Sequence, residues 1–327
     1  MSKQFSGPTR RSSLLALLGL TGLPKMSLAQ DWPGKSLTFV VPFPPGGSND
    51  IAARVVADSV RKRLGQTVVV DNKAGANGAL GVDAVLRAPK DHHTFLVASD
   101  SVSLLPLFRS TSWDLTKTFI PVAALSFQPI VVVTAPGSGI KSIKDLQALA
   151  RSRPNQVSYA SSGQGSIQHL VGELFAQQLG IDLLHVPYKG GGQAVNDVLA
   201  GQVATAVLGA AAVLPHVKAG RLVALAVSTR SRSAMLPDVP TLAESGAPDV
   251  DVAQWSALFA MDGTPVPVLA RLRSSVMETL AEPEIRQRFV SAAMEISTVS
   301  PEAFRQQMVK DRERWARLIK DRKISLE

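Results

Sequence analysis

The sequence of 327 residues contains no cysteine. That absence excludes a disulfide framework, a zinc site with cysteine ligands and a thiol nucleophile. Histidine is also scarce, and none of the five histidines belongs to an HExxH pair, which excludes a zincin site. We therefore expect neither a metal centre nor a resident cofactor.

Charged residues make up only 19% of the chain, against 45% hydrophobic residues, which is enough for a core and argues against disorder. The length fits two domains or one large domain. The formal net charge is +9, but basic residues near the C-terminus alternate with acids at helical spacing, as in residues 312–317. That pattern is typical of a solvated helix face, so we expect no nucleic-acid partner.

The first 29 residues have the features of an export signal. Basic residues, and no acid, precede an apolar run at 14–20, and small residues occupy 27–29. The apolar run is well short of the ~20 residues that span a bilayer. We predict cleavage after Ala29, which leaves 31 Lys and Arg against 26 Asp and Glu, a net charge of +5. Residues 9–15 fit a twin-arginine signal and an ordinary secretory signal about equally well.

Short β-branched runs alternate with helical segments after this signal. The pattern predicts strands at 37–42, 67–71 and 94–98, separated by helices at 48–64 and 78–87. The residues that would cap or close the first of these helices are Ser48, Asn49, Asp50 and Gly65. This β-α-β-α-β order is typical of an open parallel sheet.

The same alternation restarts near residue 129 and ends in a helical segment. The later strands are predicted at 129–133, 157–160, 183–186, 203–208 and 222–227, and the later helices at 142–151, 166–179, 193–199, 266–280, 283–292 and 301–319. Helices alone cannot complete a sheet, so the last three should pack back onto the first half of the chain.

We therefore predict an α/β protein of two lobes, each an open and mostly parallel sheet flanked by helices, with a ligand cleft between the lobes. Residues 30–127 plus 255–327 would form the first lobe and residues 128–254 the second. The chain would pass between lobes near residues 126–128 and 253–256.

Two glycine-rich turns, at residues 44–50 and 161–166, follow predicted strands and open predicted helices. Glycine lets a backbone approach a ligand closely, and the unpaired N–H groups of a helix start favour an anion. Facing each other at the carboxyl ends of two sheets, such loops suit a small carboxylate. A third candidate is the loop at 188–192. From spacing alone, an ordinary turn with a routine helix cap explains the first loop at least as well, and a flexible loop explains the third.

Signals for catalysis are weaker. P-loop, GxGxxG and GxSxG motifs are all absent. Ser166 and His169 would be neighbours one turn apart on a helix, but no acid is in place to orient the histidine. We expect His169 to anchor its loop by hydrogen bonding. An exported α/β hydrolase or isomerase that uses Ser166 and His169 is the alternative.

Ordered motifs run through the whole mature chain: Trp32-Pro33-Gly34-Lys35, Gly46-Gly47-Ser48-Asn49-Asp50, Val70-Asp71-Asn72-Lys73-Ala74-Gly75, Tyr159-Ala160-Ser161-Ser162-Gly163-Gln164-Gly165-Ser166, His185-Val186-Pro187-Tyr188-Lys189-Gly190 and Pro237-Asp238-Val239-Pro240-Thr241. Together they resemble the Bug family of extracytoplasmic solute receptors, the periplasmic binding components of tripartite tricarboxylate transporters.

The resemblance implies a type II periplasmic-binding-protein fold, whose two lobes close by hinge motion around one solute. It implies a periplasmic, monomeric receptor that performs no chemistry, captures a small organic carboxylate and serves the membrane subunits of the transporter. The ligand-binding residues to which it points are Gly46, Gly47, Ser48, Asp50, Ser161, Gly163, Ser166, His169, Tyr188 and Gly190. A ligand sensor for a membrane signalling partner would use the same cleft, so that alternative stays open.

The sequence departs from the family pattern where the ligand could be affected. Ala204 and Leu208 stand where relatives commonly carry aspartates, and Leu208 lies at the end of a predicted strand. An amine contact made there in relatives would be absent here. We therefore expect a solute without an ammonium group, such as a di- or tricarboxylate or an aromatic carboxylate.

Overall fold

The computed structural model describes residues 1–2, 4 and 32–326. The predicted export signal and its cleavage after Ala29 therefore lie almost entirely outside the described residues. Pro33–Glu327 forms one compact unit. Within the described ranges, none of the helices combines the length and the hydropathy that a bilayer crossing requires.

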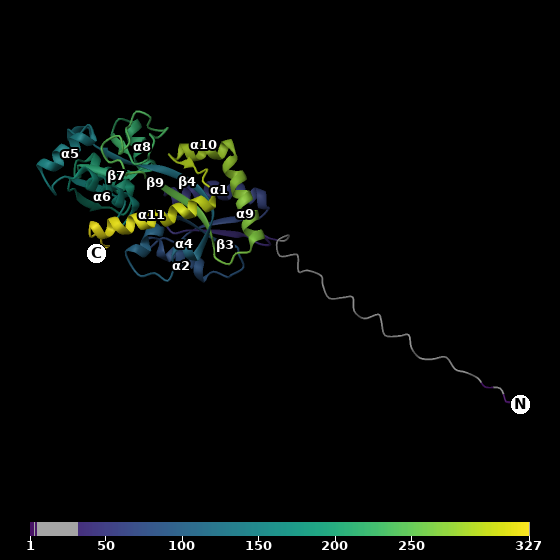
Figure 1. Cartoon of the computed structure of the whole chain (residues 1–327). Helices are drawn as coiled ribbons and strands as arrows, with labels where there is room; N and C mark the ends of the chain where they lie inside the picture. Colours follow the sequence, from purple (N-terminus) through teal and green to yellow (C-terminus); the bar gives the residue numbers. More distant parts are fainter. Residues whose placement is uncertain (3, 5–31, 327) are drawn as a thin grey trace. The chain divides into compact units, whose positions relative to one another are not determined.

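Helices and strands alternate through most of this unit (Figure 1). The strands are β1 (Leu37–Val41), β2 (Val68–Asn72), β3 (Thr94–Ser99), β4 (Phe119–Thr134), β5 (Ser158–Ser161), β6 (Leu184–Pro187), β7 (Thr205–Gly209), β8 (Val223–Val227), β9 (Ala253–Met261) and β10 (Glu295–Ile296). The helices are α1 (Ser48–Leu64), α2 (Ala79–Arg87), α3 (Asp100–Leu104), α4 (Leu115–Thr118), α5 (Ile143–Ser152), α6 (Ile167–Leu179), α7 (Gly191–Leu199), α8 (Ala210–Lys218), α9 (Val266–Ala281), α10 (Pro283–Ser291) and α11 (Pro301–Asp321). Single 3-10 turns are η1 (Ala76–Gly78), η2 (Leu105–Leu107) and η3 (Pro136–Ser138).

The strands join into one mixed sheet. Its order is β2-β1-β3-β9-β4-β7-β5-β6, with β8 and β10 each paired to β4. β1 pairs in parallel with β2 and β3, and β5 with β6 and β7, as the α/β alternation predicts. The prediction of mostly parallel sheets needs correction at the centre, because the pairs made by β4 and β9 are antiparallel.

β4 is a long central strand that serves both halves of the sheet. It pairs with β9 from Phe119 opposite Met261 to Pro129 opposite Ala253, and with β7 from Ile130 onward. The segments at 126–128 and 253–256, where the sequence predicts that the chain passes between lobes, are partners in this ladder. The two segments that are predicted to cross between lobes therefore lie side by side in the sheet, one in β4 and one in β9.

Helices cover both faces of the second half of the sheet. Along β7, Val207 packs into a cluster with side chains of α5 and α6, whereas Ala206 and Leu208 pack into a cluster with α7 and α8. This is the alternation expected of successive strand residues. Leu208 is fully buried in its cluster.

The long helix α11 contributes to two core clusters. Phe304 and Met308 pack with side chains of β1, β3 and β9, while Trp315 and Leu318 pack with side chains of β5 and α6. In Figure 1 the helix, in yellow, runs alongside β4, with which it is in contact.

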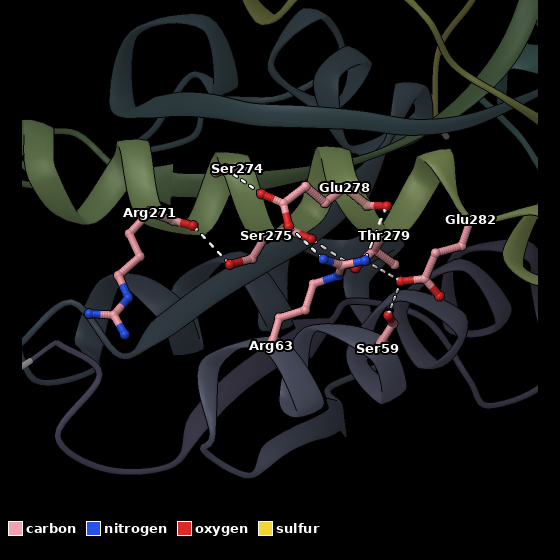
Figure 2. A network of polar contacts seen from close by, with 8 residues as sticks. All are labelled: Ser59, Arg63, Arg271, Ser274, Ser275, Glu278, Thr279 and Glu282. Carbon is pink, nitrogen blue, oxygen red and sulfur yellow. Dashed lines mark hydrogen bonds and ion pairs between the residues drawn. The ribbon is translucent and has the colours of Figure 1, made fainter.

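The far end of α1 is fastened to α9, as Figure 2 shows. Arg63 lies 2.5 Å from the carboxylate of Glu278 and 2.6 Å from that of Glu282, the residue after α9. Ser59 Oγ donates to Glu282 Oε1 at 2.7 Å, and together with Arg63 it lowers the pKa of that carboxyl. The helix closes at Gly65 with φ of +66°, as predicted. These contacts hold α1 while its other end carries the first glycine-rich loop.

Candidate ligand-binding site

One buried carboxylate holds the loop between β1 and α1. Asp50 is only 3% exposed and accepts hydrogen bonds from Gly46 N at 2.9 Å, Arg54 Nε at 3.0 Å and Asn72 Nδ2 at 3.0 Å. Burial acts to raise the pKa of Asp50, but the hydrogen bonds from Arg54, Gly46 and Asn72 outweigh it and lower the pKa. Asp50 therefore shapes the loop with both of its oxygens.

The outer part of this loop offers backbone amides and one hydroxyl. The N-cap of α1 is Gly47, not Ser48, Asn49 or Asp50 as predicted, because the helix begins at Ser48 and those three residues form its first turn. The first N–H groups of a helix have no partner within it. Ser48 Oγ likewise makes no hydrogen bond within the described part of the chain. These donors fit the anion site that the sequence predicts.

The second loop is organised from within by Ser161 and two histidines. Ser161 is fully buried; its Oγ accepts a hydrogen bond from Gly163 N at 3.2 Å and lies 2.7 Å from His185 Nε2. Gly165 N donates to His169 Nδ1 at 3.1 Å, which confirms that His169 anchors the loop. Ser166 caps α6, its Oγ accepting from the backbone N of His169 at 3.2 Å.

His169 and His185 form a stacked, neutral pair. Their ring centroids are 3.7 Å apart and their planes differ by 5°. Burial lowers the pKa of His169 to about 4; burial and the neighbouring His169 lower the pKa of His185 to about 3. No hydrogen bond joins Ser166 Oγ to the His169 ring in the described structure. The two residues therefore do not form the nucleophile and base that the hydrolase alternative requires.

Because His169 and His185 stay neutral in the folded chain, we expect the protein to lose stability in acid. Between pH 6.5 and about 4 the unfolded chain binds protons on these histidines and the folded chain does not. The free energy of unfolding should therefore decrease as the pH is lowered through that window, by about 1.4 kcal/mol per pH unit for each histidine that stays neutral in the folded chain. Thermal unfolding followed by circular dichroism should show a shallower pH slope for His185→Gln than for the wild type. Equal slopes would contradict this account of the pair.

The third candidate loop lies against the second. Tyr188 N donates to Ser161 O at 3.1 Å, and a side chain at Gly163 would come within 3.3 Å of Tyr188 O. Burial and a 2.6 Å hydrogen bond from the Tyr188 hydroxyl to Asp197 raise the pKa of Tyr188 to about 12. Gly190, at φ of +152°, is the N-cap of α7 and faces open space. The structure thus brings Ser161, Gly163, Tyr188 and Gly190 together at the carboxyl ends of β5 and β6.

Sequence reasoning missed several residues of this region. A Cβ placed at Gly191 would lie 2.8 Å from the side chain of Ala212 in α8 and 3.9 Å from Ser162 Oγ, so the starts of α7 and α8 and the loop after β5 meet there. Ser162 Oγ makes no hydrogen bond with any described residue, unlike Ser161 Oγ. Strand alternation offered a signal, because if one of two adjacent serines at a strand end is buried, the other faces outward.

One strand links the first loop to the others. On β9, Ser256 Oγ donates to Asn49 Oδ1 in the first turn of α1, and Gln254 Oε1 accepts from Gln168 Nε2 of α6 at 3.0 Å. Gln254 Oε1 also accepts from Gln128 Nε2 at 3.4 Å. Gln128 Oε1 in turn accepts from Ala211 N, in the first turn of α8, at 2.8 Å. The starts of α1, α6 and α8 are thus joined to neighbouring residues of β4 and β9.

Comparison with known proteins identifies the kind of molecule that carries these loops. Residues 52–324 match the tripartite tricarboxylate transporter family receptor. The chain belongs to this family. The resemblance drawn from the motifs is confirmed, and the chain is a solute receptor of the periplasmic-binding-protein class, not an enzyme.

Individual relatives cover nearly the whole receptor. Protein BugT of Bordetella pertussis is 35% identical over 315 residues, 94% of this chain and 97% of that protein. A solved structure of an R. palustris protein with adipate is 30% identical, has a TM-score of 0.82 and covers 90% of this chain and 99% of its own. MatC from Rhodopseudomonas palustris with bound malate is 28% identical, has a TM-score of 0.78 and covers 88% and 100%.

Proposed function

We propose that this receptor captures a small dicarboxylate between the starts of α1 on one side and of α6, α7 and α8 on the other. The observation that carries the proposal is the attachment of α1 and α6 to one strand, through Ser256 and Gln254 of β9. Helix starts present unpaired N–H groups and a partial positive charge, which favour a carboxylate. The adipate and malate bound by two relatives belong to that ligand class.

In this proposal the molecule closes as two lobes. The first comprises residues 30–127 plus 255–327 and the second residues 128–254, with hinges near 126–128 and 253–256. The antiparallel pairing of those two segments in β4 and β9 supports a single bending line. The last turns of α11 pack into the core with α6 through Trp315 and Leu318, and Arg322 pairs with Glu173 of α6 at 2.9 Å, so this end of the helix would move with the second lobe.

We propose further that the ligand lacks an ammonium group. The outer loops, at 44–49, 161–166 and 188–192, contain no acid, and the carboxylate of Asp50 is occupied by Arg54, Asn72 and Gly46. Leu208, where relatives commonly carry aspartate, is apolar and fully buried against α7 and α8, so it supplies no negative charge near the loops. The site thus offers donors without a negative charge to balance a cation.

Delivery completes the proposal. The signal at 1–29 directs export, cleavage follows Ala29, and the mature monomer presents its ligand to the membrane subunits of a tripartite transporter. Ligand sensing would use the same loops but a different partner.

Thermal-shift and calorimetric titrations of the mature chain test this function. The panel contains succinate, malate, glutarate and adipate, with aspartate and glutamate as ammonium-bearing counterparts. We expect at least one dicarboxylate to raise the melting temperature without being converted. At a ligand concentration of a hundred times Kd, binding should raise the free energy of unfolding by about 2.7 kcal/mol. The proposal fails if both amino acids bind more tightly than every ammonium-free acid, or if a bound acid is converted.

A further inference from the structure

The side-chain amide of Asn49, a buried residue at the start of α1, is hydrogen-bonded only through its oxygen. Asn49 is 5% exposed, and its Oδ1 accepts from Ser256 Oγ. Its Nδ2 has no partner among the described residues. Because the oxygen is fixed on β9, the NH₂ group must point away from that strand residue. The nitrogen does not belong to the buried atoms that lack a partner, so it still reaches solvent and is open to contact by a ligand.

The side-chain amide of Gln254, two residues from Ser256 on β9, is held in the same way. Gln254 Oε1 accepts from both Gln168 and Gln128, while its Nε2 makes no hydrogen bond within the described ranges. Residues two apart on a strand share a face and are separated by about 7 Å. Asn49, held by Ser256, and Gln254 are therefore neighbours on the β9 face to which α1 and α6 attach.

We infer that Asn49 Nδ2 and Gln254 Nε2 both donate to one carboxylate group of the ligand and make the site reject an ammonium group there. This inference rests on the proposed dicarboxylate function and names the residues that would select a carboxylate group over an ammonium group. Hydrogen bonds to a carboxylate are stronger than those between neutral groups. An ammonium group has only donors, whereas the groups that these two side chains turn toward the ligand are N–H donors. Gln254 Oε1 already accepts two hydrogen bonds, and Asn49 Oδ1 faces Ser256, so an ammonium group would meet donors instead of acceptors.

Asn49→Asp tests the selection directly. The new carboxylate keeps the shape of the side chain and can still accept from Ser256, but it replaces the free donor with a negative charge. Calorimetry should show the Kd for adipate rising by roughly 100-fold. The affinity for δ-aminovalerate, which carries an ammonium group in place of one carboxylate, should rise relative to that for adipate. A purely structural role for Asn49 would weaken both ligands together.

Matched variants control for added charge. Gln254→Glu should weaken adipate binding in the same direction, whereas Asn155→Asp and Gln177→Glu, at exposed positions, should leave both affinities unchanged. The inference is overturned if wild-type protein binds adipate and both site variants keep its affinity and its preference over δ-aminovalerate; the receptor function would then stand. Failure of the wild type to bind any acid of the panel would instead overturn the proposed function and this inference with it.

Discussion

Replacing Asp50 by Asn is expected to abolish ligand binding and to lower the free energy of unfolding by about 2–4 kcal/mol. The groups that surround the carboxylate are all donors, from Gly46, Arg54 and Asn72. An amide nitrogen in place of one oxygen would face a donor in a side chain that is 96% buried. The loop that presents Gly47 and the first amides of α1 would lose the contact that shapes it.

Asp58→Asn is the matched control for that experiment. Asp58 lies on the same helix and pairs with Arg288 at 3.2 Å, but its side chain is 61% exposed, so the ion pair contributes little to stability. Chemical denaturation and calorimetry of the two variants side by side would separate loss of charge on α1 from loss of the loop anchor. An Asp50→Asn protein that binds its ligand as tightly as the wild type would show that the loop keeps its shape without the carboxylate.

Gly47→Val is expected to weaken ligand binding by more than about 100-fold while lowering stability by only about 1 kcal/mol. The backbone at Gly47 has φ of −76°, which any residue adopts, and the nearest atom to an added Cβ is Pro44 O at 3.7 Å. The protein itself can therefore accept the larger side chain. A ligand that approaches the first amides of α1 cannot.

Gly137→Val controls for the effect of a branched residue at an exposed glycine. Gly137 lies in η3, and no atom lies within 4 Å of its Cβ position. This variant should bind the best acid of the panel as the wild type does. Unchanged affinity in Gly47→Val would mean that the ligand does not approach the first turn of α1.

The local parts of the fold could be predicted from the sequence. Strand–turn–helix units such as β1–α1 and β5–α6 depend on short-range patterns, and both glycine-rich loops open helices where expected. Gly65 closes α1 as expected, because the end of a helix is set by neighbours in the chain.

The missed elements depend on residues that are distant in sequence. The first half of β4 was not predicted, since Pro121 and Pro129 interrupt its pattern and normally argue against a central strand. Pro215 within α8 hid that helix in the same way. β9 is stabilised by pairing with β3 and β4 on either side, which no local pattern reveals.

The candidate site was predicted in outline but not in its detail. The glycine-rich loops were identified, yet Ser161 and Asp50 turn inward, and their polar atoms are used to shape the loops. Asn49 and Gln254, by contrast, acquire their significance only through Ser256 and Gln168, which are remote in sequence. Side-chain direction within a loop depends on such tertiary partners.

The position of the ligand in a crystal of the mature chain with its tightest-binding dicarboxylate tests the central claim most directly. The account predicts one carboxylate within hydrogen-bond distance of the first turn of α1 and of Gln254, with the rest of the ligand against the loops at 161–166 and 188–192. Density for the acid elsewhere, such as the groove lined by Arg109, Lys117 and Arg312, would contradict it.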